Sequence, residues 1–315
     1  HNLRKVLGAN TEKVYATING KANDSQLCFS SGEMFRLIES YITDNFGEKG
    51  KFRFVIAPDD TPYACTCPSC TAIGNTEKNA TPAVTELILR LSQRFPRHFF
   101  FTTSYLTTQQ VTDKQLPPNA GVIVSAINFP LRRIDGKDAK EKAFAGQLEQ
   151  WKNVTKNIYI WDYINNFDDY LTPMPILKIA RQRLQFFKQH GASGIFFNGS
   201  GYSYSSFDEM RTFVLSALLI NPELSVDNLT ASFFNQEYPA AKKWLYDYYT
   251  DLENGTQSGK RLGIYAGIRE SEKAYLTPEK FIKFYDEMND FVSNAKGKER
   301  KKLHELQTAL SYTRM

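Results

Sequence analysis

The sequence predicts an α/β protein of the (β/α)₈ TIM-barrel type, with its first one to three strands missing from the chain or lying upstream of it. Two observations lead to this prediction. Strand-like and helix-like patterns alternate through the first two thirds of the 315 residues, which is the arrangement of parallel βαβ units. Nearly every predicted strand also ends in polar or aromatic residues, as expected where the carboxyl ends of barrel strands converge on one mouth.

The predicted strands are short runs of apolar, β-branched and aromatic residues between turn signals. The first, 14–18, stops at Asn19-Gly20, a dipeptide typical of tight turns. The others span 52–57, 98–105, 121–127, 157–163 and 194–198. Apolar residues spaced three and four apart predict helices near 31–47, 83–95, 139–154 and 175–190.

The pattern changes near residue 205, because the sequence from Ser206 onward is almost wholly helical. We therefore divide the chain into a barrel portion, 1–204, and a helical C-terminal region, 205–315, that packs on the barrel or follows it. An open doubly wound sheet also fits alternating strands and helices. No Gly-rich phosphate-binding loop follows any predicted strand, however, so the barrel is the favoured architecture.

Composition and charge exclude several classes of protein. The chain has 39 Lys and Arg against 34 Asp and Glu, a net charge of +5, with 42% hydrophobic residues, which is typical of globular proteins. The densest basic run, 296–302, is typical of a solvated helix end, so nucleic acid is not an expected partner. No stretch approaches the ~18 apolar residues that a membrane span needs. Without an initiator Met, the sequence looks like a piece of a longer protein, and an upstream N-terminal segment is an expected partner.

The residues at the predicted strand ends indicate a carbohydrate ligand. Aromatic rings pack against the apolar faces of sugar rings, while amides and carboxylates bind the hydroxyl groups. Aromatic residues make up 14% of the chain, and many of them are expected in the core. The predicted sugar contacts are Tyr105, Asn128, Trp161, Tyr163 and Asn198. The expected ligand is therefore an oligosaccharide or polysaccharide.

Three aspartates are candidates for acid–base chemistry. Asp59 and Asp60 follow the strand 52–57, and Asp162 lies between two aromatic residues at the end of the strand 157–163. Glycoside hydrolysis needs one protonated carboxyl group for the leaving oxygen and one carboxylate as nucleophile or base, and it needs no cofactor. We predict Asp60 as the acid and Asp59 or Asp162 as the second carboxylate. In the alternative interpretation, Asp59 and Asp60 only cap a turn between two prolines.

The four cysteines, Cys28, Cys65, Cys67 and Cys70, are the candidate metal ligands. Three of them form a C-x-C-x-x-C loop soon after the aspartate pair. Disulfides within so short a loop are sterically poor, because a bridge requires a specific Cα separation. One structural Zn²⁺ bound by four thiolates satisfies the spacing with less strain. Zinc, disulfides and free or partly paired thiols stay open as alternatives, and none of them makes the cysteines catalytic.

Several of these residues also occur, in the same order, in a known family. They are Asn19-Gly20-Lys21, Gln26-Leu27-Cys28, Pro58-Asp59-Asp60, the loop Cys65-x-Cys67-Pro68-x-Cys70, Trp151, Trp161-Asp162-Tyr163 and Asn166-Phe167. With them the sequence resembles, from about residue 15 to about residue 250, an uncharacterised bacterial domain family of polysaccharide-degrading gut bacteria. That family is similar in fold to α-glucuronidases and β-hexosaminidases. The cysteine-rich loop is the specific part of the resemblance.

The resemblance implies a glycoside-hydrolase-type barrel that is exported to the periplasm or cell surface, or secreted, and acts on complex glycans. The recurrent aspartate of the family falls on Asp60, with Asp59 beside it. One departure is Asn198, because the family often has an acidic residue after Gly194-Ile-Phe-Phe. The family usually also carries an N-terminal non-catalytic domain and an early barrel portion. We therefore expect a glycoside hydrolase, with a catalytically inactive carbohydrate-binding barrel as the alternative that Asn198 favours.

Overall fold

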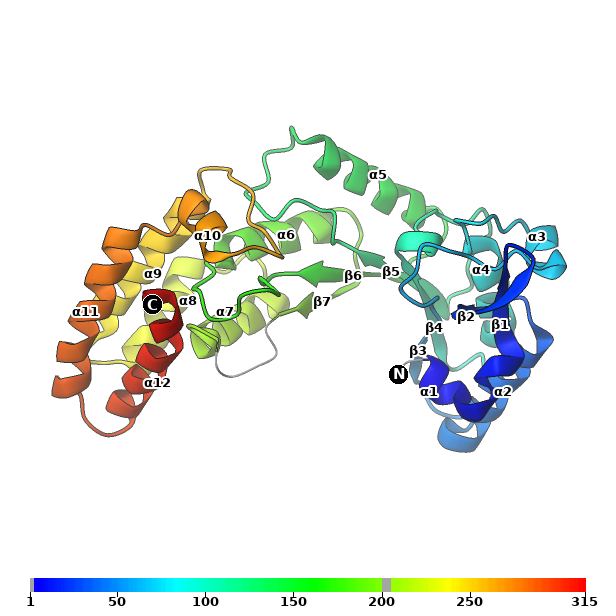
Figure 1. Ribbon diagram of the computed structural model, residues 1–315, viewed down its shortest axis with the longest axis horizontal. Coiled ribbons are helices and arrows are strands. Elements are labelled where there is room, and N and C mark those ends of the chain that lie inside the picture. Colours follow the sequence, from blue (N-terminus) through cyan, green and yellow to red (C-terminus); the bar gives the residue numbers. More distant parts are fainter. Residues whose placement is uncertain (1–2, 200–204) are drawn as a thin grey trace. The chain divides into compact units, whose positions relative to one another are not determined.

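The computed structural model describes residues 3–199 and 205–315 and shows an α/β fold (Figure 1). The chain forms two compact units, each built from several stretches of sequence. The first unit comprises His1–Ala126, Ala143–Trp161 and His190–Phe196, and the second comprises Ile127–Lys142, Asp162–Gln189 and Phe197–Met315. The chain thus leaves the first unit and returns to it twice.

A sheet of five parallel strands is the centre of the fold. The strand order is β3-β4-β5-β6-β7, so strands that follow one another along the chain are neighbours in the sheet. The strands are β3 Arg53–Val55, β4 Phe99–Ser104, β5 Ala120–Ser125, β6 Ile158–Tyr163 and β7 Gly194–Asn198. The α/β prediction is confirmed. The described strands form a curled half-barrel, and they do not amount to the eight strands of a complete barrel.

The first predicted strand belongs to a different sheet. β1 (Tyr15–Ile18) pairs with β2 (Lys21–Leu27) in a two-stranded antiparallel hairpin. The connecting Asn19 and Gly20 have φ angles of 51° and 74°, as a type I′ turn requires, and Asn and Gly are the residues that tolerate this conformation best. Because so tight a turn returns the chain antiparallel to itself, β1 is not a strand of the half-barrel.

The four predicted helices are present as α2, α4, α5 and α6. α2 begins after Ser31, whose hydroxyl oxygen accepts hydrogen bonds from the backbone N–H groups of Glu33 and Met34. Two short helices, α1 and α3, were not predicted. The helices up to residue 189 are α1 Leu3–Leu7, α2 Gly32–Phe46, α3 Pro68–Ile73, α4 Thr81–Arg94, α5 Ala139–Lys152 and α6 Leu177–Gln189, with 3₁₀ turns at Gly8–Val14 and Leu106–Thr108.

The described chain from residue 205 onward contains helices and no strand, as its sequence pattern predicts. These helices are α7 Asp208–Ile220, α8 Val226–Glu237, α9 Lys242–Thr256, α10 Ile268–Ala274, α11 Pro278–Asn294 and α12 Gly297–Arg314. Over residues 3–199 and 205–315, no helix combines the length and the apolar character needed to cross a membrane.

The two faces of the sheet differ within the first unit. Along β6, Ile158 and Ile160 are buried, whereas the alternate side chains Tyr159 and Trp161 are half-buried. The parallel register places Ser125 of β5 beside Trp161. Since side chains alternate between the faces of a strand, one face is packed and the other stays partly open to solvent in the described part of the first unit. In a barrel, the active site lies at the carboxyl ends of the parallel strands.

Candidate functional site

The residues predicted from the sequence divide between the two units. Asp59, Asp60, Tyr105, Trp161 and the four cysteines belong to the first unit, whereas Asn128, Asp162, Tyr163 and Asn198 belong to the second. We therefore describe the candidate site of each unit separately.

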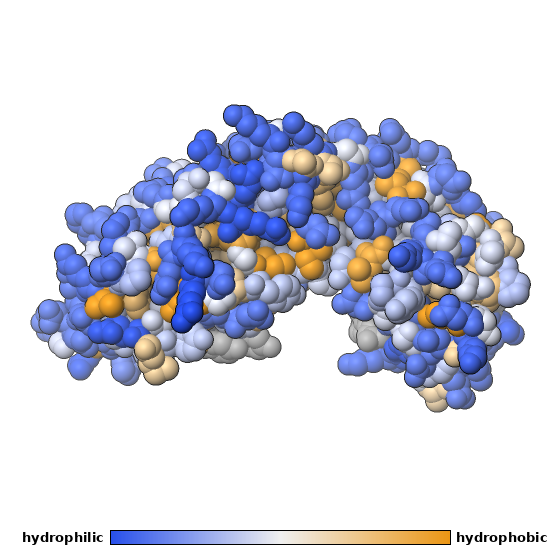
Figure 2. All heavy atoms as spheres, turned by 45° about the horizontal axis from the view of Figure 1, so that its top comes forward, coloured by the Kyte–Doolittle hydropathy of each residue, from blue (hydrophilic) through white to orange (hydrophobic). Residues whose placement is uncertain are grey.

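An aromatic surface lies on the open face of the sheet in the first unit, and we define it by Tyr159, Trp161 and Phe196. Phe196 of β7 is 53% exposed, and its ring meets Trp161 edge to face, with centroids 5.0 Å apart and an interplanar angle of 72°. Gly194 keeps room for this arrangement, because a Cβ atom there would lie 2.5 Å from the Tyr159 ring. Figure 2 shows that hydrophobic side chains reach the molecular surface in separate patches among hydrophilic ones.

Polar groups accompany the aromatic surface at the carboxyl ends of the strands. Ser125 is the register partner of Trp161, and Tyr105, which is half-buried, follows β4 directly with an extended backbone. The indole N–H of Trp161 is buried and has no hydrogen-bond partner among the described residues. A buried donor without a partner costs free energy. The open face thus offers ring surface, with the half-buried Ser125 beside it.

Asp59 and Asp60 lie in a loop that follows β3. Arg4 Nε donates to the Asp59 carboxylate at 2.7 Å, and the Asp59 backbone N–H donates to Gln26 Oε1 at 3.1 Å. The Gln26 amide also donates to the Asp59 carbonyl oxygen at 3.2 Å, so a buried glutamine from β2 fixes the loop. Asp60 is exposed. The loop therefore holds one carboxylate in an ion pair and presents the other to solvent.

Asp162, the other predicted carboxylate, is completely buried in the second unit. Arg183 of α6 donates to both of its oxygens, and the Arg183 Nε to Asp162 Oδ2 distance is 2.8 Å. Arg183 also donates to the Pro130 carbonyl at 2.8 Å and lies over the Phe129 ring. A carboxylate enclosed in this way has no exposed surface to offer a substrate. We therefore give Asp162 a structural role in place of the predicted catalytic one.

The other predicted sugar contacts of the second unit differ in how far their side chains are exposed to solvent. Asn128 is exposed, while Tyr163 and Asn198 are half-buried. Tyr163 packs edge to face on Phe167, with ring centroids 6.0 Å apart. The Asn198 backbone carbonyl accepts a hydrogen bond from the Ile164 N–H at 3.2 Å, which joins the ends of β6 and β7.

The four cysteines form one cluster in the first unit. Their sulfur atoms all lie within 4.8 Å of one another, no disulfide joins them, and three of the four side chains are buried. Hydrogen bonds from Cys28 and Cys70 lower the pKa of the Cys65 thiol, whereas sharing the cluster with Cys65 raises the pKa of Cys28. Among the residues that the structure describes, this cluster is the group whose ligand atoms lie close enough together to hold a metal ion.

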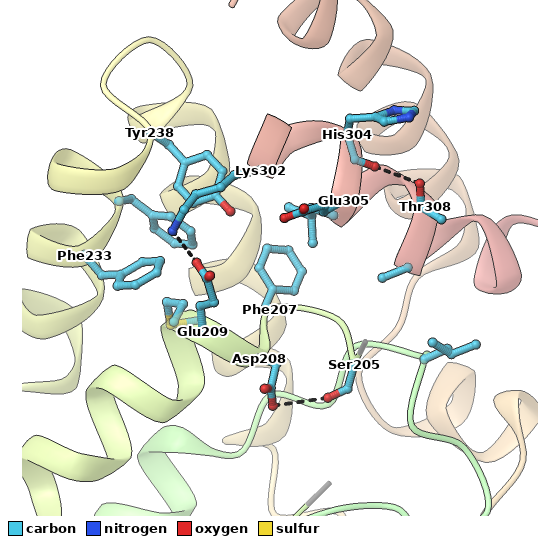
Figure 3. Close-up of a pocket in the computed structure, with 15 residues that line it drawn as sticks. Ser205, Phe207, Asp208, Glu209, Phe233, Tyr238, Lys302, His304, Glu305 and Thr308 are labelled. Carbon is cyan, nitrogen blue, oxygen red and sulfur yellow. Dashed lines mark hydrogen bonds and ion pairs between the residues drawn. The ribbon is translucent and has the colours of Figure 1, made fainter. Parts of the chain in front are cut away.

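Sequence reasoning missed a pocket in the second unit (Figure 3). It has a volume of about 640 Å³, and its wall includes the aromatic side chains of Phe207, Phe233 and Tyr238. Lys302 of α12 points towards Glu209 of α7 and forms an ion pair with it. These groups come from the consecutive helices α7 and α8, with their ends, and from α12, which is about 60 residues further along the chain, so no local motif marks them. The only signal in the sequence is the density of aromatic and charged residues in the helical region.

Fold and site together define an α/β half-barrel domain with an open aromatic face and a cysteine cluster. The chain belongs to the family described as a domain of unknown function, DUF4838, whose model matches residues 6–251. The match covers the sheet, the aspartate loop and all four cysteines. A comparison with curated proteins finds no match to the chain.

Proposed function

We propose that this chain is a carbohydrate-binding protein and that its first unit binds a glycan on the aromatic surface of Tyr159, Trp161 and Phe196. The observation that carries the proposal is the partly exposed Trp161–Phe196 pair on the open sheet face. Aromatic rings offer flat apolar area for the C–H faces of pyranose rings at little cost in conformational entropy. Ser125, the register partner of Trp161, is a polar residue at the edge of this area.

The strand ends support the same proposal. In parallel sheets with crossover helices, ligands bind outside the carboxyl ends of the strands. Ser125 and Trp161 lie at or near the ends of β5 and β6, and Tyr105 follows the end of β4. A glycan ligand also accords with the export to the periplasm or cell surface that the family resemblance implies, and we propose that location for the protein.

Hydrolysis is the second candidate function, and the exposed Asp60 favours it. In this proposal Asp60 donates a proton to the leaving oxygen, and Asp59, oriented by Arg4, is the second carboxylate. Binding ranks first because a hydrolase requires two accessible carboxyl groups. Of the three predicted aspartates, one is exposed, one is held by Arg4 and one is buried with Arg183.

Binding and product release from a panel of plant and host glycans test both functions. Trp161→Ala is expected to weaken binding of the preferred glycan by about two- to twelvefold, since one aromatic stacking contact contributes about 0.5–1.5 kcal/mol and about 1.4 kcal/mol is tenfold. Tyr312→Ala on α12, which removes another exposed aromatic ring, is the matched control and should bind as the wild type does. Thermal melts of both variants confirm that they fold.

The outcomes separate the two candidates. Glycan binding without product release supports a binding protein. Product release that is lost in Asp60→Asn, with glycan binding retained, supports hydrolysis. Equal binding by wild type and Trp161→Ala, or no binding to any glycan of the panel, contradicts the proposed surface.

A further inference from the structure

We propose that Cys28, Cys65, Cys67 and Cys70 bind one Zn²⁺ in a closed tetrahedral site that holds the first unit together. This inference is independent of glycan binding, because it depends only on the geometry of the four sulfur atoms. The sequence left zinc, disulfides and free thiols open, and the structure supplies distances that distinguish them.

Two of the six sulfur separations match those of a tetrahedral metal site, and all six are within 4.8 Å. Cys28 Sγ lies 3.7 Å from Cys67 Sγ and 3.8 Å from Cys70 Sγ. Four sulfurs placed tetrahedrally around Zn²⁺ with Zn–S bonds of about 2.3 Å lie about 3.8 Å apart. A disulfide would instead need two sulfurs at about 2.05 Å. The cluster thus has the size of a zinc tetrathiolate and is too wide for the bonds of two disulfides.

The four ligands come from two segments that are far apart in sequence. Cys28 follows β2, Cys65 and Cys67 lie in the loop that leads into α3, and Cys70 lies within α3. Cys67 caps the N-terminus of α3, where its sulfur accepts the Cys70 N–H at 3.5 Å. The capping geometry fixes the spacing of these two thiols, so a short helix turns the C-x-x-C sequence towards Cys28.

Hydrogen-bond donors surround the sulfur atoms from outside. The Thr17 backbone N–H donates to Cys65 Sγ at 3.2 Å, and the Ser30 hydroxyl lies 3.0 Å from Cys70 Sγ and 3.4 Å from Cys28 Sγ. Donors of this kind orient metal-bound thiolates and offset their negative charge. The described residues therefore provide both the ligands and the groups that support them.

The position of the cluster indicates what the ion would do. Cys28 lies between β2 and α2, whereas the other three cysteines lie between the aspartate loop and the first turns of α3. An ion bound by all four would therefore join these two segments of the chain. Apart from α3, the segment 56–80 has no helix and no strand of its own among the described residues, and separate backbone hydrogen bonds such as those of Ala64 to Glu77 and Thr66 to Thr17 hold it. Four protein ligands leave no open coordination position, which is typical of structural sites. We infer a structural ion, with each coordinating thiol releasing its proton to solvent on binding.

Metal analysis of the full chain, purified without chelator, tests the proposal. About one zinc per chain is expected from the closed four-thiolate site. Cys67→Ser is expected to lose most of this zinc and to melt at a lower temperature than the wild type. Ser69→Ala changes an exposed residue of α3, between Cys67 and Cys70, and serves as the matched control, which should keep the zinc content and the melting temperature of the wild type.

Two further measurements keep the test decisive if Cys67→Ser fails to fold. Replacement of the metal by Co²⁺ should give the visible absorption bands of a tetrahedral tetrathiolate site, and a mercurial reagent should release the bound zinc as it titrates four thiols. A folded wild-type protein without zinc and with four freely reactive thiols overturns the proposal. A protein mass lowered by two hydrogens for each disulfide also overturns the proposal. Bound iron, seen as a coloured protein, overturns it as well. A loss of glycan binding alone neither supports nor contradicts the zinc site, because metal content, melting temperature and thiol reactivity do not depend on the glycan.

Discussion

Arg183 donates hydrogen bonds to both carboxylate oxygens of Asp162, and the two side chains are 1% and 0% exposed. The Tyr163 backbone N–H donates to the same carboxylate at 2.8 Å, so the Asp162 charge is compensated from both sides. The guanidinium charge also lies over the Phe129 ring, 4.5 Å from its centroid. A charged pair without water is stable only while both members are present.

Removal of Arg183 should therefore be costly. We expect Arg183→Met to lower the free energy of unfolding by about 3–5 kcal/mol, because Asp162 would be left as a buried charge without a partner. Urea denaturation measures this difference. Lys188→Ala on the same helix is exposed and should change stability by no more than about 0.5 kcal/mol. A loss below about 1 kcal/mol in Arg183→Met would show that the pair is less isolated from water than its burial indicates.

Glu253 should give the protein a distinctive pH dependence. Its two oxygens accept the backbone N–H groups of Leu177 and Lys178 at 2.8 and 3.0 Å, which caps α6 from α9. Burial raises the pKa of Glu253 above its usual value of 4.5, and these two backbone hydrogen bonds oppose the shift only in part. The folded state thus binds the Glu253 proton more tightly than the unfolded state does. The stabilisation that results is complete below pH 4.5 and is lost as the pH rises through the pKa of Glu253 in the folded state.

Glu253→Gln isolates this effect, because glutamine has the shape of the protonated acid but does not titrate. We expect the variant to be less stable than wild type by about 1–2 kcal/mol at about pH 4, since one of the two capping bonds is lost. The difference should shrink as the pH rises to about 7. Unfolding curves at both pH values measure it, with the exposed Glu272→Gln as control. A difference that grows with pH would mean that the cap acts in its charged form.

Gly121 of β5 should not tolerate a methyl group. A Cβ atom there would lie 2.3 Å from the Asn157 carbonyl oxygen and 2.7 Å from the Phe101 ring. Gly121→Ala is therefore expected to cost about 1–3 kcal/mol, the usual cost of overpacking. Gly146→Ala is the matched control, because a Cβ atom at this helical position meets nothing within 4 Å. The control should gain up to about 1 kcal/mol. If thermal melts show that both variants are less stable than wild type, or that both are more stable, the proposed clash at Gly121 is contradicted.

Lys302 joins α12 to α7 and α8. Burial disfavours its charge, but hydrogen bonds with Glu209 and Glu237 outweigh this effect and raise the pKa of Lys302. Lys302 and then Lys298 lower the pKa of Glu237 from 4.5 to about 2, so this ion pair stabilises the fold above pH 4.5 and is lost as the pH falls through about 2.

We expect Lys302→Met to cost about 1 kcal/mol at neutral pH, because both carboxylates are partly exposed and solvent screens the pair. The cost should diminish in unfolding experiments as the pH falls from about 5 towards 2, where Glu237 becomes protonated. Lys298→Met removes a more exposed partner of the same carboxylate and should cost less. An unchanged cost at low pH would show that Lys302 stabilises α12 through packing of its aliphatic stem.

The features that depend on neighbouring residues could be predicted from the sequence. Alternating apolar runs placed all five strands of the half-barrel, and helical spacing placed α2, α4, α5 and α6 within a few residues. Asn19-Gly20 marked a turn, because few other residue pairs adopt positive φ at both positions. The cysteine spacing marked the loop that enters the cluster. Each of these signals acts over a turn or a strand, so each can be read along the chain.

Which distant residues meet depends on the tertiary structure. Asp162 follows the alternation of β6 and was predicted as a site residue, yet Arg183, 21 positions later, encloses it in the core. The pocket beside Lys302 needs three helices to form. Burial and pairing depend on which faces pack together, and that depends on contacts between segments that no local pattern specifies.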